Sequence, residues 1–222
     1  MVKYKKLIEN NQFKTGDLLL FNHKDNLSSC SECFFSCFTD LIKFFTNSKY
    51  SHAAIIIEGS DAIKMNLFPG IPSIGIERYY VLQSSYEPFP DAEDNQIKLG
   101  VEIVSFSKLV STFYGEIYWR HINCLRNDSF LLKLIQAHSV VHNRPYDMDP
   151  YDWIRAAFKI EVGPTHRLDK FWCSALVAYV YAKLGLLPEN TNWTLVSPVM
   201  LSQISMKPTF INCTIDDEIR IL

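Results

Sequence analysis

The stretch KFWCSALVAYVYAKLGLL, residues 170–187, decides the fold because it joins a long apolar helix pattern to a cysteine near its start. Gly185 and then Pro188 predict where this helix ends. Its apolar residues recur at the i, i+3, i+4 spacing of a helix with one buried face: Leu176, Val177, Val180, Tyr181 and Leu184. We therefore expect a core helix that begins near Cys173.

Cys173 falls in the first turn of this predicted helix. Backbone N–H groups there have no partner within the helix, and the positive end of the helix dipole favours a negative charge. Both effects stabilise a thiolate, so the position predicts a lowered thiol pKa and a nucleophile. The alternative is a small buried core cysteine, and a catalytic role needs a base nearby.

His52 is the candidate base. It lies at the start of a predicted strand in the stretch YSHAAIIIEG, residues 50–59, which is rich in β-branched residues. Gln83 lies within a second predicted strand, YYVLQSS at residues 79–85, as a polar residue among apolar neighbours. Cys173, His52 and Gln83 together fit a Cys–His–polar triad in which the imidazole takes the thiol proton.

The third member of such a triad fixes the tautomer and orientation of the imidazole. Gln83 can do this through its amide oxygen, although it stabilises imidazolium less than a carboxylate would. Glu87 and His121 are the alternatives for this role. The backbone N–H of Cys173 is the expected donor to an oxyanion.

Two further patterns raise the question of a metal site. Cys30, Cys33 and Cys37 lie in a Phe-rich segment at residues 28–47, which we expect to be an amphipathic helix. His138 and His142 share a face of a predicted helix at residues 128–142, but no Glu follows the first His as in HExxH. We favour ordinary core or surface positions for both sets, and no metal or organic cofactor is expected.

Composition excludes several other classes of function. Hydrophobic residues make up 48% of the 222 residues and the formal net charge is −2, which does not favour nucleic acid as a partner. No apolar run approaches the roughly 20 residues of a membrane span, and residues 1–17 lack a secretory signal pattern. Six cysteines without such a signal are expected to be reduced, so we expect a cytoplasmic protein.

The remaining pattern predicts one α+β domain over residues 1–222, with a core at about 15–205 and an insertion at about 59–79. We expect an antiparallel sheet of about five or six strands against the Cys173 helix. Further strands are expected at residues 18–21, 100–104, 116–122 and within 210–222. Further helices are expected at 106–113, 151–158 and from a Ser197–Pro198 start.

The order of these segments resembles a known family. GDLLLF, YSHAAIIIE, YYVLQSS, RPYDMDPYDW, FWCSALVAYVYAKLGLL and a late Ser-Pro pair follow one another as in circularly permuted NlpC-type papain-fold proteins. The YiiX-like and poxvirus-type branch is the most similar, with lecithin retinol acyltransferase-like enzymes as cousins; in this branch the His precedes the Cys. The resemblance spans residues 15–205.

This resemblance implies a permuted papain-like fold with Cys173 as nucleophile, His52 as base and a polar residue on the neighbouring strand. Many members have Glu or His where this chain has Gln83. The implied reaction is cysteine-dependent hydrolysis or acyl transfer at an amide, ester or thioester, with an amidase or peptidase favoured.

Two alternatives stay open at this point. A lipid-directed acyltransferase or deacylase, with peripheral membrane contact, fits the aromatic content of 14% and the Phe-rich segment. A catalytically inactive interaction or structural protein fits the departure at Gln83. The expected partner is accordingly a peptide, an amide or a lipid acyl group, and the sequence predicts no oligomeric state.

Overall fold

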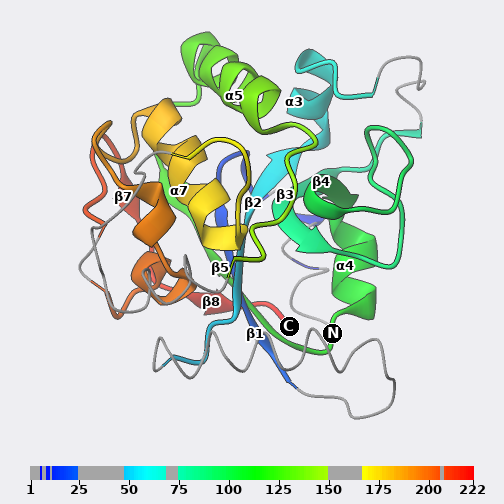
Figure 1. Ribbon diagram of the computed structural model, residues 1–222, viewed down its shortest axis with the longest axis horizontal. Helices are drawn as coiled ribbons and strands as arrows, with labels where there is room; N and C mark the ends of the chain where they lie inside the picture. Colours follow the sequence, from blue (N-terminus) through cyan, green and yellow to red (C-terminus); the bar gives the residue numbers. More distant parts are fainter. Residues whose placement is uncertain are drawn as a thin grey trace.

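A six-stranded antiparallel sheet forms the centre of the computed structural model, which describes residues 6, 9–10, 12–24, 48–68, 75–149, 167–205 and 208–222 (Figure 1). The strand order is β4-β3-β2-β1-β5-β8, and every pair of neighbours is antiparallel. A separate ribbon pairs β6 with β7. The strands are β1 (Leu18–His23), β2 (His52–Glu58), β3 (Tyr79–Tyr86), β4 (Leu99–Ser105), β5 (Gly115–Arg120), β6 (Ile122–Asn123), β7 (Thr214–Ile215) and β8 (Ile219–Arg220).

Helices pack on both faces of this sheet, so the class is mixed α+β. The helices are α3 (Gly59–Lys64), α4 (Phe106–Thr112), α5 (Asp128–Val141) and α7 (Cys173–Leu184), followed by the 3₁₀ turns η2 (Trp193–Leu195) and η3 (Pro198–Leu201). Figure 1 shows α5 and α7 together on one side and α4 apart from them. Alternate residues of the strands form two cores accordingly, one with α7 and one with α4.

Helix α7 is the centre of the larger core. It begins at Cys173 and ends where Gly185 adopts the left-handed conformation, with φ 77°. Every residue of α7 except Lys183 is buried. The sequence pattern predicted one buried face, whereas this helix is enclosed on all sides, as expected for a helix that is apolar all round. Deep burial fixes the position of its first residue, Cys173.

The strands and most helices predicted from the sequence are present. Asn127 caps α5 by accepting from the N–H of Phe130 (3.0 Å), and Ser105 caps α4 by accepting from the N–H of Lys108 (3.1 Å). The predicted helices at 28–47 and 151–158 lie outside the described residues. The structure tests neither of them.

Three local features add detail to the sequence pattern. The insertion expected at about 59–79 begins with helix α3, and a Cβ at Gly59, its first residue, would lie 2.0 Å from the carbonyl oxygen of Glu77. The strand expected within 210–222 is present as β8, at the edge of the six-stranded sheet, and the tail also contributes the short strand β7. Pro198 does begin a helical turn, but the side chain of Ser197 makes no capping hydrogen bond.

Asp17 joins β1 to the segment that follows β5. Its buried carboxylate accepts from Trp119 Nε1 (2.8 Å), the N–H of Ile122 (3.2 Å), Arg126 Nη2 (2.8 Å) and His121 Nδ1 (2.9 Å). A charge buried at this depth is tolerated because several donors surround it.

Among the described helices, none has the length and apolar character needed to cross a membrane.

Candidate active site

Cys173 is the first residue of α7, and only 2% of its surface is exposed. Burial raises the pKa of its thiol, while the backbone N–H groups of Ala53 and Ser174 act in the opposite direction. We predicted a lowered pKa from the position at the helix start. That prediction was wrong in direction, because removal of the sulfur from water outweighs the nearby N–H groups.

His52 is the first residue of β2 and lies opposite Phe21 of β1. The two rings are in contact, with centroids 5.0 Å apart. Burial lowers the pKa of His52 from 6.5 to about 4, and the hydrogen bond to Gln83 only partly opposes this. The imidazole is therefore neutral near pH 7.

Gln83 contacts His52, as the sequence predicted for the third member of the triad. The distance from His52 Nε2 to Gln83 Oε1 is 2.9 Å, and Gln83 is fully buried. Gln83 Nε2 donates to Glu87 Oε1 (3.1 Å) and to Glu102 Oε1 (3.0 Å). Two carboxyl groups therefore hold the amide so that its oxygen faces the imidazole.

This arrangement fixes the tautomer of His52. An amide oxygen can only accept, so His52 Nε2 carries the proton and donates it to Gln83. Nδ1 is then unprotonated and available as a base. Gln83 thus positions the imidazole in the manner required of an orienting group.

Two glutamates behind Gln83 form a carboxyl pair. Glu102, on β4, is fully buried, and burial raises its pKa from 4.5 to about 8. Burial likewise raises the pKa of Glu87 from 4.5 to about 7. Glu102 Oε2 has no hydrogen-bond partner among the described residues, which is consistent with a protonated carboxyl group.

No sequence pattern pointed to Glu102 as a site residue. The available signal was a single acidic residue inside an apolar strand, at the position that pairs directly with Gln83. Glu87, an alternative for the third member, contacts Gln83 rather than the imidazole. His121, the other alternative, is paired with Asp17 (2.9 Å).

The thiol of Cys173 and the imidazole of His52 lie near the same end of β2 but are not hydrogen-bonded to each other. The N–H of Ala53, the residue after His52, faces the Cys173 sulfur. Side chains of adjacent strand residues point to opposite faces of the sheet. Ala53 belongs to the core that contains α7, whereas Phe21, which lies opposite His52, belongs to the other core. The imidazole therefore lies on the face of the sheet away from α7. Within the described residues, no hydrogen bond joins His52 to Cys173.

Tyr146 is a further neighbour of the thiol, and its position in the sequence gave no sign of this contact. It lies in the stretch RPYDMDPYDW and forms a β-bridge with Phe171, two residues before Cys173. Burial raises the pKa of its hydroxyl, and the adjacent Cys173 adds to this effect. The main chain on both sides of the bridge therefore places a phenol beside the first turn of α7.

Two sets of residues with metal-ligand spacing were expected to be ordinary core or surface residues. Cys30, Cys33 and Cys37 lie outside the described residues. His138 and His142 do come together at the end of α5, as their i, i+4 spacing predicted, and a carboxylate from a distant loop joins them.

Comparisons with known proteins give only a distant likeness. No family model matches the chain, and no curated protein matches it. Among solved structures, the crystal structure of metalloprotein YiiX from Escherichia coli O157:H7 is similar, with a TM-score of 0.48 and 14% identity. The alignment covers 94% of this chain and 98% of that one.

Proposed function

We propose that the protein is a cysteine-dependent hydrolase or acyl-transfer enzyme on a permuted papain-like fold. Cys173 would be the nucleophile and His52 the base, and the substrate would be an amide, ester or thioester. One observation carries this proposal. The thiol at the start of a buried helix faces the strand residue next to an imidazole whose tautomer is set by Gln83.

The proposed chemistry begins from neutral groups. Burial raises the pKa of Cys173 and lowers that of His52, so a thiol and an imidazole, rather than an ion pair, form the resting state. With the imidazole turned toward α7, His52 Nδ1 would take the thiol proton as the sulfur attacks the carbonyl carbon. The imidazolium would then give this proton to the leaving group.

Backbone donors complete the proposed reaction. The N–H groups at the start of α7, including that of Cys173, would stabilise the oxyanion of the tetrahedral intermediate. Water or an acyl acceptor would then cleave the thioester on Cys173 and restore the thiol. An amidase or peptidase remains our preferred assignment, and the Phe-rich segment that favoured a lipid substrate lies outside the described residues.

A second candidate is a binding protein that has lost catalysis. The observation in its favour is that His52 and Cys173 make no hydrogen bond to each other within the described residues, while the thiol is 2% exposed. A binding protein needs no access to the sulfur, whereas an enzyme does. The two candidates differ in the reactivity expected of Cys173.

Alkylation by iodoacetamide at pH 4–10, located by mass spectrometry, distinguishes them. For an enzyme, the rate at Cys173 should rise as His52 loses its proton near pH 4 and stay level to neutral pH. His52→Ala should remove this level region and leave only the alkaline increase. Circular dichroism of the variant controls for folding.

Cys124 and Cys213 serve as internal controls in the same molecule, because burial raises the pKa of both. A Cys173 profile that matches theirs and does not change in His52→Ala would contradict the enzyme proposal and favour the binding protein.

A further inference from the structure

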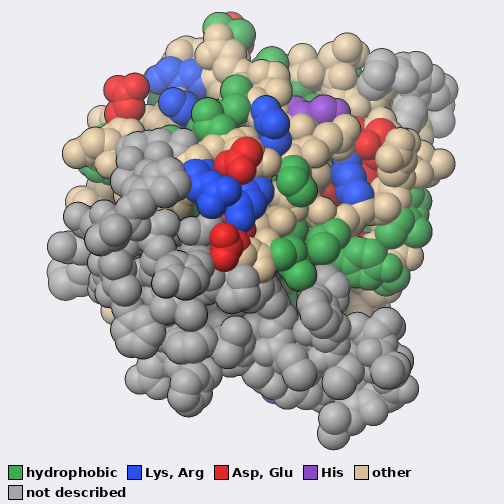
Figure 2. All heavy atoms as spheres, in the orientation of Figure 1, with side chains coloured by type: hydrophobic (Ala, Val, Ile, Leu, Met, Phe, Trp, Pro, Cys, Tyr) green, Lys and Arg blue, Asp and Glu red, His purple; other side chains and the backbone are tan. Residues whose placement is uncertain are grey.

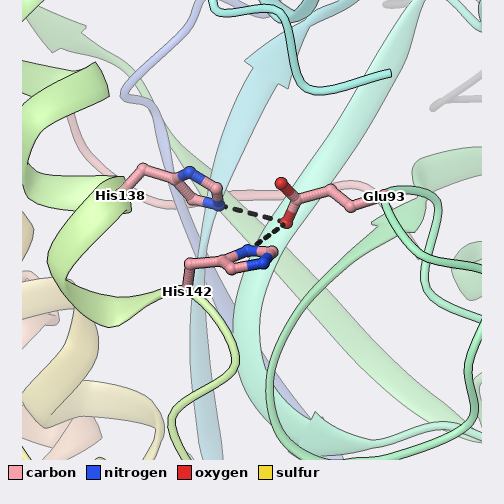
Figure 3. Close-up of side chains that lie close together, drawn as sticks. All are labelled: Glu93, His138 and His142. Atoms are coloured by element: carbon pink, nitrogen blue, oxygen red, sulfur yellow. Dashed lines mark hydrogen bonds and ion pairs between the residues drawn. The ribbon is translucent and has the colours of Figure 1, made fainter. Parts of the chain in front are cut away.

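Three potential metal ligands meet at the end of α5 (Figure 3). His138 is in the last turn of α5, His142 is the residue after it, and Glu93 comes from the loop before β4. Glu93 Oε2 lies 3.1 Å from His138 Nε2 and 3.4 Å from His142 Nδ1. One atom from each residue lies within 4.8 Å of both others, and Figure 3 shows all three side chains pointing toward one another.

We propose that Glu93, His138 and His142 bind a divalent transition-metal ion, with Zn²⁺ the best fit. Zinc binds imidazole nitrogen and carboxylate oxygen at about 2.0–2.2 Å, so ligand atoms in a tetrahedral site lie about 3.3 Å apart. The two measured distances to Glu93, 3.1 and 3.4 Å, already match this spacing. The two imidazole nitrogens lie within 4.8 Å of each other.

The type of ligand supports zinc over the hard cations. Mg²⁺ and Ca²⁺ prefer sites made of oxygen atoms, whereas two imidazoles and one carboxylate suit Zn²⁺ and its transition-metal neighbours. Three protein ligands leave a fourth position for water or another small ligand. The cluster therefore has the composition of an open zinc site rather than a closed structural one.

The surroundings give the cluster both rigidity and access. The side chains of His138 and Glu93 are each 9% exposed, while that of His142 is 39% exposed. Figure 2 shows histidine atoms at the surface beside α5, so an ion can enter from solvent. Asn143 Nδ2 donates to His142 Nε2 (3.0 Å), which places the ring proton on Nδ1, facing Glu93, and a metal ion at Nδ1 would displace that proton.

A carboxylate that accepts from two histidines would give the same short distances without any metal. Glu93→Gln separates the two possibilities, because an amide oxygen still accepts hydrogen bonds but is a poor ligand for zinc. His142→Ala removes the most exposed ligand. Asp94→Asn is the matched control, since Asp94 lies in the same loop and pairs with Lys98 (3.0 Å).

The test is titration of the purified, metal-free full chain with Zn²⁺ by calorimetry and with Co²⁺ by absorption. We expect one site per chain in the wild type and in Asp94→Asn. Glu93→Gln and His142→Ala should each weaken Zn²⁺ binding by more than about 100-fold, the upper end of the loss seen when even an outer-shell partner is removed.

Cobalt reports which residues bind the metal. Ligation by nitrogen and oxygen gives visible bands without sulfur-to-metal charge transfer, and all six cysteines remain in each variant. Sulfur charge transfer in the wild type, or equal Zn²⁺ affinity in wild type, Glu93→Gln and His142→Ala, would overturn the proposal. Absence of binding in the wild type would show that the cluster is an ion pair only.

Discussion

Glu102→Gln is predicted to make the protein more stable at alkaline pH. Burial raises the pKa of Glu102 from 4.5 to about 8, so the folded protein keeps a proton there that the unfolded chain has lost. Between these two values the folded state binds more protons, and stability therefore falls as the pH rises. At 1.36 kcal/mol per pH unit, the full difference corresponds to at most about 5 kcal/mol above pH 8.

The substitution copies the protonated state. The new amide would keep the oxygen that accepts from Gln83 Nε2 (3.0 Å) and place an NH₂ group where Glu102 Oε2 has no partner among the described residues. We therefore expect equal stability of wild type and variant near pH 4.5. Above pH 8 the variant should be more stable by a few kcal/mol, because Glu102 must ionise only in the wild type.

Urea unfolding at pH 4.5, 6, 7.5 and 9 measures this difference directly. Glu87, whose pKa burial raises to about 7, repels the Glu102 charge, so the difference between the two proteins reports the ionisation of Glu102 together with this repulsion. Parallel free-energy curves for the two proteins over this pH range would refute the reasoning. They would show that Glu102 ionises in the folded state as easily as in the unfolded chain.

Two further predictions concern buried titratable side chains of the sheet. Asp17→Ala should lower the free energy of unfolding by about 3–5 kcal/mol, because it leaves Arg126 and Trp119 Nε1 without the carboxylate that accepts from them. A decrease of less than about 1 kcal/mol in urea unfolding would contradict this prediction. His52 should make the protein less stable in acid. Because burial lowers its pKa from 6.5 to about 4, its contribution is complete above pH 6.5 and is lost as the pH falls through 4, by up to about 3 kcal/mol. His52→Gln should remove this decrease in the free energy of unfolding between pH 6.5 and 4. The same decrease in wild type and variant, measured by urea unfolding, would contradict the prediction.

Much of the fold follows from local pattern. The β-branched run of β2 and the apolar spacing of α7 are strong signals, and Gly185 marks the end of α7 because glycine adopts its positive φ without strain. The antiparallel sheet of six strands agrees with the five or six expected. Where the signal was short, as in α3, the pattern gave no helix, because a few residues take their structure from what they pack against.

The candidate site was predictable only in part. The sequence places His52 and Gln83 on two predicted strands, and the structure joins them at 2.9 Å. Glu102 and Glu93 could not be assigned, because their partners come from other strands and helices and depend on pairing across the sheet. The pKa of Cys173 was predicted in the wrong direction, since the complete burial of α7 is a property of the packed protein rather than of one helix pattern.

Formation of an acyl-thioester on Cys173 tests the central claim most directly. The full chain would be mixed with p-nitrophenyl acetate at pH 7 and quenched in acid, and acetylated peptides would be identified by mass spectrometry, with wild type and His52→Ala in parallel. We predict rapid acetylation of Cys173 that hydroxylamine reverses, slowed about 100-fold or more in His52→Ala, as expected for loss of a general base. Acetylation of Cys173 no faster than of Cys124, or equal rates with and without His52, would contradict the account.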